Sequence, residues 1–276
     1  MHPTSDSLTG ARVGIVGAGR LGTALSAALR EAGLDVEGPA GRGQVPRGRD
    51  AIVLCVPDEE IPAAAATVAG AAPLVGHTSG ATRLDALEPA GGAAFGLHPL
   101  QTFPERAPAE PPSAGRAALG APGSDGPSPL EAFAGAGCAV AGSTAEALRF
   151  ARGLARVLGM IPFEIDDEGR AAYHAAASVA SNFTVTLLAA AERVAAGAGL
   201  APAEARAMLA PLVRRTVESV AELGPERALT GPIARGDYAT VDAQRRALEE
   251  AAPELLELFD ELVRHTRSLA GHEVRA

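Results

Sequence analysis

The chain contains no lysine, because all 24 of its basic residues are arginine. This absence excludes every mechanism that needs a lysine as an acid, a base or a Schiff-base nucleophile, and it excludes a Walker-type phosphate-binding lysine. Aromatic residues make up only 3% of the sequence, and tryptophan is absent. Helix packing must therefore depend on small side chains and on leucine and valine.

Basic runs, long apolar runs and an N-terminal targeting pattern are also missing. A net charge of −9 with so few aromatic residues argues against nucleic acid as a partner. No continuous apolar stretch reaches the roughly 18 residues that cross a bilayer, so we expect no membrane association and a cytoplasmic location. Cys55 and Cys138 lack the spacing of a metal site, so we expect two buried, reduced thiols, with no disulfide and no metal.

A glycine-rich turn is the most informative motif that is present. Residues 17–22 read Gly-Ala-Gly-Arg-Leu-Gly, between a predicted strand at 12–16 and a predicted helix at 21–32. In this frame the first glycine allows the tight turn, the second admits a pyrophosphate, and the third lets the helix pack on the strand. We predict that a dinucleotide binds at Gly17, Gly19, Arg20, Leu21 and Gly22. The alternative is a glycine-rich loop of another α/β protein.

Hydrophobic patterning predicts an N-terminal sheet domain. After the first strand we expect six more, at 35–38, 51–56, 73–77, 94–97, 138–141 and 161–165. The stretch 39–50 is too short and too rich in Gly, Pro and Arg for a crossover helix, and 105–129 is expected to be a long surface loop. Helices are expected at 61–69 and, after a capping box from Ser143 to Glu146, up to residue 158.

From residue 167 onward the strand signal disappears, and the sequence predicts only helices, at 169–196, 202–223 and 225–229, followed by a final one or two within 240–269. We therefore predict an α/β fold with a Rossmann domain at 1–166 and an all-helical domain at 167–276. In such an arrangement the ligand lies at the carboxyl ends of the strands, in a cleft between the domains.

The end of the second predicted strand indicates which nicotinamide cofactor binds. Glu37 falls inside that strand, whereas an NAD site normally has a carboxylate at its end. The sequence that follows carries Arg42, which suits a 2′-phosphate, and Arg47 and Arg49 could assist. We therefore expect NADP, with NAD possible, and the alternative is that Arg42 is a solvated loop residue. The cofactor is also expected to contact Val56, Pro57 and Ser79.

Three histidines are candidates for proton transfer, since His2, His265 and His272 lie in chain ends or on a polar helix face. One candidate, His98, follows a predicted strand and precedes a proline, which fixes an extended or turn geometry. This geometry would present the imidazole, Gln101 and Thr102 to substrate. The alternative is a purely structural turn.

A second set is the polar stripe of His174, Ser178 and Asn182, spaced four and four along one face of the predicted long helix. Such a stripe must face water, a ligand or a helix–helix hydrogen-bond seam. Two further positions stay open: His77 before Thr78 and Ser79 could contact cofactor or substrate or simply precede a helix cap. Likewise, Arg235 after a Gly-Pro break could bind a substrate carboxylate or be an ordinary loop residue.

These segments together resemble the Rossmann-like/DUF2520 family. The shared motifs are the glycine turn, HTSG at 77–80, GLHPLQTF at 96–103, YHAAA…SN at 173–182 and LTGP-x-x-RGD at 229–237. The family is similar to ketopantoate reductases, pyrroline-5-carboxylate reductases and β-hydroxyacid dehydrogenases. The resemblance implies a Rossmann domain followed by a helical domain like the C-terminal domain of 6-phosphogluconate dehydrogenase, which commonly forms a homodimer.

The resemblance also bears on the catalytic residues. Ser178 stands where β-hydroxyacid dehydrogenases carry their lysine, so their proton-transfer scheme cannot operate unchanged. The Gly-x-His-Pro segment is similar to one in prephenate dehydrogenases, where the histidine contacts the reacting hydroxyl, and this favours His98. The missing helix after the second strand thins the adenosine side of the cofactor site.

The sequence therefore predicts an NADP-dependent oxidoreductase that acts on a small keto acid or imine. His174 or His98 would donate the proton, Asn182 and Ser178 would orient the carbonyl, and Arg235 would hold a carboxylate. The alternatives are a non-catalytic nucleotide-binding regulatory or scaffold protein and a deazaflavin (F420)-linked NADP oxidoreductase.

Overall fold

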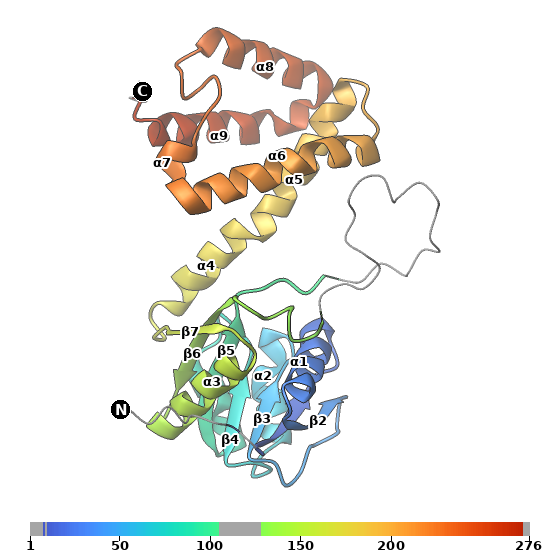
Figure 1. The fold of residues 1–276 in the computed structure, drawn as a ribbon, viewed down its shortest axis with the longest axis vertical. Helices are drawn as coiled ribbons and strands as arrows, with labels where there is room; N and C mark the ends of the chain where they lie inside the picture. Colours follow the sequence, from blue (N-terminus) through green and yellow to red (C-terminus); the bar gives the residue numbers. More distant parts are fainter. Residues whose placement is uncertain (1–7, 9, 105–127, 273–276) are drawn as a thin grey trace. The chain divides into compact units, whose positions relative to one another are not determined.

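The computed structural model describes residues 8, 10–104 and 128–272 (Figure 1). Consequently His2 and nearly all of the expected loop at 105–129 lie outside the described residues. Contacts between Cα atoms divide the chain into two compact units, residues 1–179 and residues 180–276. The first unit holds the sheet and extends past the predicted boundary at 166 to include most of one further helix.

The first unit is built on a seven-stranded sheet in the order β2-β1-β3-β4-β5-β6-β7. The strands are β1 (Arg12–Val16), β2 (Asp35–Ala40), β3 (Ala51–Leu54), β4 (Leu74–His77), β5 (Ala93–Pro99), β6 (Gly137–Gly142) and β7 (Ile161–Glu164). Each one was expected from the sequence to within two residues of its ends, which confirms the α/β class.

Strand direction locates the ligand-binding edge of the sheet. All neighbouring strands are parallel except β5 and β6, which are antiparallel. β1 has β2 on one side and β3 on the other, so the strand order reverses there. In open α/β sheets, ligands bind outside the carboxyl ends of the strands at this switch point.

Alternation along β3 explains the two layers of helices. Ala51 and Val53 join one buried cluster, which includes side chains of α1 (Arg20–Glu31) and α3 (Ala145–Val157). Ile52 and Leu54 join the other cluster, with α2 (Ile61–Thr67) and the 3-10 turn η2 (Leu84–Ala90). Since successive side chains of a strand point to opposite faces, a continuous apolar strand must be covered on both.

One of two local expectations holds and the other needs correction. Residues 41–50 contain no helix, as the sequence predicted. The N-cap of α3, however, is Thr144 and not Ser143: its Oγ1 accepts a hydrogen bond from the Ala147 N–H at 3.1 Å. Ser143 Oγ instead accepts from the Ala94 N–H at 2.8 Å, which fastens the start of α3 to β5.

The long helix predicted at 169–196 is interrupted at Ser181, giving α4 (Arg170–Ala180) and α5 (Asn182–Gly197). The second unit continues with α6 (Pro202–Leu223), α7 (Pro225–Ala228), α8 (Tyr238–Ala251), η4 (Pro253–Leu255) and α9 (Leu256–Leu269). The break between α7 and α8 ends at Asp237, whose Oδ1 caps α8 by accepting from the Thr240 N–H. The expected all-helical C-terminal region is therefore confirmed.

One result differs from the expectation that no stretch could span a membrane. Taken across Ser181, Arg170–Gly197 forms a helical run of 28 residues that contains an 18-residue stretch of mean hydropathy 1.2, long and apolar enough by length and composition alone. Within that run Glu192 pairs with Arg206 of α6. One such helix is weak support for a membrane span, because an apolar packing helix of a soluble protein satisfies the same criterion.

Candidate functional site

The glycine turn joins β1 to α1 at the carboxyl edge of the sheet. Gly17 has a φ of +108°, in the region that favours glycine, and a Cβ there would overlap the carbonyl oxygen of Cys55. A Cβ at Gly22 would overlap the carbonyl oxygen of Gly17. Thus the first and third glycines are required by the turn itself and by the approach of the helix.

Gly19 is different. It is the N-cap of α1 with an ordinary φ of −71°, and a Cβ there would meet nothing within 4 Å. Every other described glycine with open space around its Cβ position has a positive φ. Neither backbone conformation nor packing within the protein accounts for a glycine at position 19. Glycine is a favourable N-cap residue, which is a local reason for its presence, and its open Cβ position also leaves this backbone accessible to a ligand.

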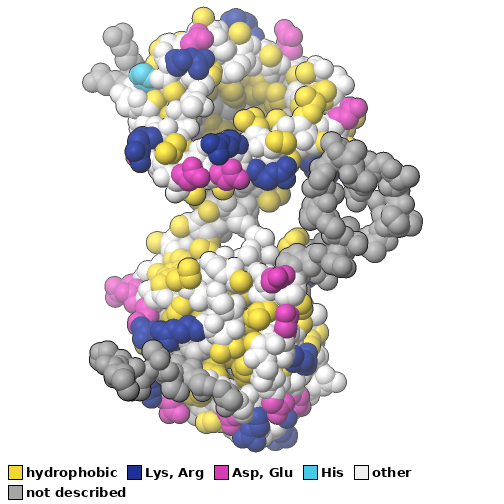
Figure 2. All heavy atoms as spheres, viewed as in Figure 1, with side chains coloured by type: hydrophobic (Ala, Val, Ile, Leu, Met, Phe, Trp, Pro, Cys, Tyr) yellow, Lys and Arg dark blue, Asp and Glu magenta, His cyan; other side chains and the backbone are white. Residues whose placement is uncertain are grey.

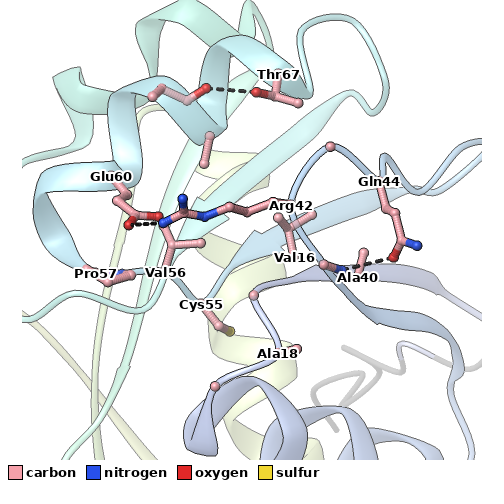
Figure 3. A pocket seen from close by; sticks show the side chains of 16 residues that line it. Val16, Ala18, Ala40, Arg42, Gln44, Cys55, Val56, Pro57, Glu60 and Thr67 are labelled. Atoms are coloured by element: carbon pink, nitrogen blue, oxygen red, sulfur yellow. Dashed lines mark hydrogen bonds and ion pairs between the residues drawn. The ribbon is translucent and has the colours of Figure 1, made fainter.

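A pocket of about 770 Å³ opens beside this turn (Figure 3). This first pocket lies between the end of β1, the loop after β2, the end of β3 and helix α2. Its lining residues are Val16, Gly17, Ala18, Gly19, Ala40, Gly41, Arg42, Gly43, Gln44, Cys55, Val56, Pro57, Glu60, Ala63, Ala64 and Thr67. Its size and mostly apolar walls are typical of small-molecule sites.

Arginines near the end of β2 have separate roles. Arg42 lines the first pocket with its side chain 90% exposed, and it forms an ion pair with Glu60. Arg49 is held on β2 by Asp35 at 3.0 Å and Glu37 at 2.9 Å, and does not line the pocket. Glu37 lies inside β2 as expected, opposite Gly14. Arg42 is therefore the β2-end cation available to a pocket ligand.

A second pocket of about 360 Å³ adjoins the same turn, sharing Gly19, Cys55 and Val56 with the first. It is lined by Gly19, Arg20, Leu21, Cys55, Val56, Asp58, Thr78, Ser79 and Phe103. Between them, the two pockets include every residue expected to bind the cofactor except Gly22. Their binding role remains a prediction.

Ser79 is fixed in the wall of the second pocket by a hydrogen-bond network. Its Oγ donates to Asp58 Oδ2 at 2.7 Å and accepts from the backbone N–H groups of Ala81 and Thr82. The sequence left open whether this hydroxyl caps a helix, but η2 begins with Arg83 as its N-cap. Ser79 instead shapes a turn that leads directly to Gly80.

Both cysteines are free, as expected. Burial raises the pKa of each thiol to about 12, so neither is a thiolate at neutral pH. Among residues 8, 10–104 and 128–272, no group of three or more His, Cys, Asp or Glu could hold a metal ion.

Gly80 lies against two of the candidate histidines. A Cβ at Gly80 would come within 2.9 Å of both His98 Nε2 and His174 Nδ1. On its other side, His98 Nδ1 forms a 2.7 Å hydrogen bond with the Tyr173 hydroxyl. The rings of His98 and His174 have centroids 6.0 Å apart. The structure thus brings two histidines from separate motifs together, with Tyr173, which precedes His174 in the YHAAA…SN motif and was not expected to take part.

His98 lies within β5 and not beyond its end as the sequence predicted. The strand continues through Pro99 because β6 pairs with it, His98 opposite Ala139 and Pro99 opposite Cys138. Gln101 and Thr102 follow the strand and are exposed. The Gln101 side chain donates to the Ala132 carbonyl and accepts from the Thr102 N–H, so both of its polar atoms have partners.

A buried arginine and a third histidine lie near these rings. Arg170 is only 4% exposed and is paired with Asp167 at 2.7 Å. His77, at the end of β4, is fully buried, and its Nδ1 accepts from the Ser79 N–H. Because Nδ1 accepts, the neutral His77 ring carries its proton on Nε2.

Burial keeps His77, His98 and Tyr173 in their neutral forms at pH 7. Burial, reinforced by the nearby Arg170 charge, lowers the pKa of His77 to about 4. The pKa of His98 is also lowered to about 4, by burial and then by His174. Burial raises the pKa of Tyr173 to about 12. At pH 7 the pair is thus a phenol and a neutral imidazole, and when the phenol donates to Nδ1, the Nε2–H of His98 faces Gly80.

The depressed pKa of His77 predicts acid sensitivity. The unfolded state binds a proton at an ordinary pKa of 6.5, whereas the folded state does so only near 4. The free energy of unfolding is therefore at its full value above pH 6.5. It falls as the pH drops toward 4, by on the order of 3 kcal/mol for one such group. Urea unfolding at pH 7 and pH 5 measures this loss. His98, whose pKa is lowered to the same value, should contribute a similar loss. His77→Asn, which keeps an acceptor for Ser79, should therefore reduce the pH dependence by about half, and the exposed His265→Gln should leave it unchanged.

The other predicted residues occupy separate places. Ser178 lies on α4 one turn beyond His174, whereas Asn182 begins α5 after the interruption, so the expected stripe is shared between the two units. Arg235 is exposed in the turn that precedes α8. The sequence analysis did not single out Asp58 and Arg170 as site residues. The one signal in the sequence for the role of Tyr173 is its position directly before His174.

Comparisons with known proteins agree with this description. No curated protein matches the chain. A Bacteroides fragilis protein classed as a presumed NADP oxidoreductase is similar in structure, with a TM-score of 0.73 and 21% identity over 95% of this chain and 100% of that one. A Thermotoga maritima protein has a TM-score of 0.67 and 23% identity over 94% and 98%. A Plasmodium falciparum pyrroline carboxylate reductase with NADP bound gives 0.58 and 12% over 94% and 98%. At these identities the likeness establishes the fold alone.

The recognition made from the motifs is confirmed in the C-terminal half of the chain. Residues 136–266 match the family described as Domain of unknown function (DUF2520), a range that runs from β6 to α9. Over this range the chain is similar to the DUF2520 proteins, and as a whole it has the Rossmann fold with a helical C-terminal region.

Proposed function

We propose that the protein is an NADP-dependent reductase of a small keto acid or imine. The observation that carries the proposal is Gly19, a glycine that neither backbone conformation nor packing explains, located where two pockets meet. A pyrophosphate placed there would lie at the N-terminus of α1, whose free N–H groups favour an anion. The first pocket would then hold the adenosine half and the second the nicotinamide half.

The choice of NADP rests on Arg42. It projects from the loop after β2, where a dinucleotide's 2′ position lies in this fold, and no described carboxylate stands at the strand end to bind ribose hydroxyls. The likeness to an NADP oxidoreductase and to a reductase that holds NADP supports the same choice.

Residues of the chain would supply the proton and bind the substrate. NADPH, when bound, supplies the hydride. His98 or His174 would donate the proton, with Tyr173 fixing which nitrogen of His98 faces the reacting group. From the predicted set, Ser178 and Asn182 would orient the carbonyl or imine, and the other expected substrate contacts, Gln101, Thr102 and Arg235, would hold polar groups of the substrate.

Calorimetric titration with NADPH and NADH, followed by NADPH oxidation with a panel of 2-oxo acids and cyclic imines, tests the proposal. We expect NADPH to bind more tightly than NADH and at least one substrate to be reduced. Binding without turnover would favour the non-catalytic alternative, and reduction only with a deazaflavin partner would favour the F420-linked one. No heat from either nucleotide at millimolar concentration would overturn the whole assignment.

We also propose that the helical unit forms a homodimer. In its described part, the buried apolar side chains are only Ala205, Val241, Leu248 and Ala252. Large apolar side chains are instead exposed, as Figure 2 shows on one face. They include Phe183, Val185, Met208, Leu212 and Val217. A unit of this size needs a larger core than four small or medium side chains provide, so a second copy is the natural cover.

The homodimer predicts a specific mutational effect. Light scattering after size-exclusion chromatography should give twice the mass of one chain at micromolar concentration. Val185→Glu should reduce this mass to that of a monomer or cause aggregation, because a carboxylate cannot be buried unpaired in an apolar interface. Ile161→Glu, on the exposed face of β7 in the first unit, is the matched control and should leave the mass unchanged. A monomeric wild-type chain would contradict the proposal.

A further inference from the structure

Arg42 and Glu60 connect opposite sides of the first pocket. Arg42 comes from the loop after β2, and Glu60 ends the 3-10 turn η1 (Asp58–Glu60) before α2. Figure 3 shows the Arg42 side chain reaching across the pocket to Glu60. The Nη2–Oε1 distance is 2.8 Å, and both residues line the pocket.

Folding stability does not account for this ion pair. The Arg42 side chain is 90% exposed and that of Glu60 39%, and ion pairs of such exposure contribute little to stability. The backbone on each side is fixed independently. The Gln44 side chain accepts from the Gly41 N–H beside Arg42, and the Glu60 N–H donates to Pro57. The pair can therefore exchange partners without disturbing either element.

The pocket offers one cation and one carboxylate where the proposed 2′-phosphate would lie. A phosphate monoester carries about −1.5 to −2 charges at pH 7, so it outcompetes a single carboxylate for Arg42. Glu60 would then be left beside that phosphate without its partner. The unphosphorylated ribose of NAD would leave the Arg42–Glu60 pair in place.

We infer that Glu60 is a specificity-determining residue that competes with the 2′-phosphate for Arg42 and so limits the preference of this site for NADP over NAD. The inference rests on the proposed NADP function. Binding of NADP must displace Glu60 from Arg42, whereas binding of NAD need not. Removing the charge of Glu60 should therefore tighten one coenzyme and leave the other unchanged.

The test is calorimetric titration of the full chain with NADPH and NADH. For Glu60→Gln we expect NADPH to bind about two- to tenfold more tightly, the range set by one exposed ion pair, with NADH changed less than about twofold. The matched control is Glu59→Gln, which removes the same charge from the same turn but does not line the pocket. It should change neither affinity.

A second background shows whether Glu60 acts through Arg42. Arg42→Gln should weaken NADPH binding, and in that background Glu60→Gln should give a smaller gain than it gives in the wild type. An unchanged or weaker NADPH affinity in Glu60→Gln, or an equal gain for NADH, overturns the inference while the NADP assignment stands. Failure of the wild type to bind either nucleotide overturns both.

Discussion

Replacing Gly19 by alanine is expected to weaken NADPH binding by about 100-fold, or roughly 2.7 kcal/mol, while folding stability falls by only about 1 kcal/mol or less, the cost of losing a glycine N-cap. The backbone at Gly19 has an ordinary φ, and a Cβ there meets nothing in the protein, so the substitution creates no strain. The methyl group would instead occupy the space that a pyrophosphate needs beside the N-terminus of α1. Titration calorimetry measures the affinity, and thermal unfolding followed by circular dichroism measures stability.

Gly22→Ala serves as the contrast, three residues further along the same motif. Its Cβ would overlap the Gly17 carbonyl oxygen, so this variant should lose folding stability before binding is considered. If Gly19→Ala bound NADPH with unchanged affinity, no pyrophosphate would lie at this turn.

The second large effect is expected at the His98–Tyr173 pair. His98→Ala should lower kcat by about 10²- to 10⁴-fold, the usual contribution of a positioned proton donor, with NADPH affinity nearly unchanged. Tyr173→Phe removes the 2.7 Å hydrogen bond that fixes the imidazole tautomer but retains the ring, so it should cause a smaller loss. Steady-state NADPH oxidation with the substrate found in the panel measures both.

His265→Gln is the control for this comparison, because His265 is 68% exposed on α9. It should leave kcat unchanged. A pH profile separates positioning from mere structure: if Tyr173 fixes the tautomer of His98, Tyr173→Phe should change the pH dependence of kcat as well as its size. Full activity in His98→Ala would transfer the role of proton donor to His174.

Most of the sheet could be predicted because its signals are local. A continuous apolar run such as Ala51–Leu54 has few interpretations other than a strand covered on both faces, and the glycine turn fixes the element after β1. The N-cap of α3 was placed one residue early because Ser143 and Thr144 are both good caps. A tertiary contact, the bond from Ala94 to Ser143, decides between them.

The site could be predicted residue by residue but not as an assembly. His98 and Tyr173 are 75 positions apart and meet only because α4 packs beside β5 within the first unit. The antiparallel pairing of β6, which extends β5 through Pro99, also has no local signal, because proline normally marks the end of a strand. The hydrogen-bond partners of Arg42 and Ser79 could not be predicted either, because Glu60 and Asp58 lie in η1, far from both residues in the sequence.

α4 places its ring side chains in the same compact unit as the sheet. His77, His98, Tyr173 and His174 all belong to the first compact unit, which ends only at Val179. The residues proposed to transfer protons are thus assembled within one unit, and their spacing does not depend on the second. The geometry of this cluster is therefore a property of the sheet-bearing unit alone, and substitutions in the helical unit should leave the His98–Tyr173 hydrogen bond intact.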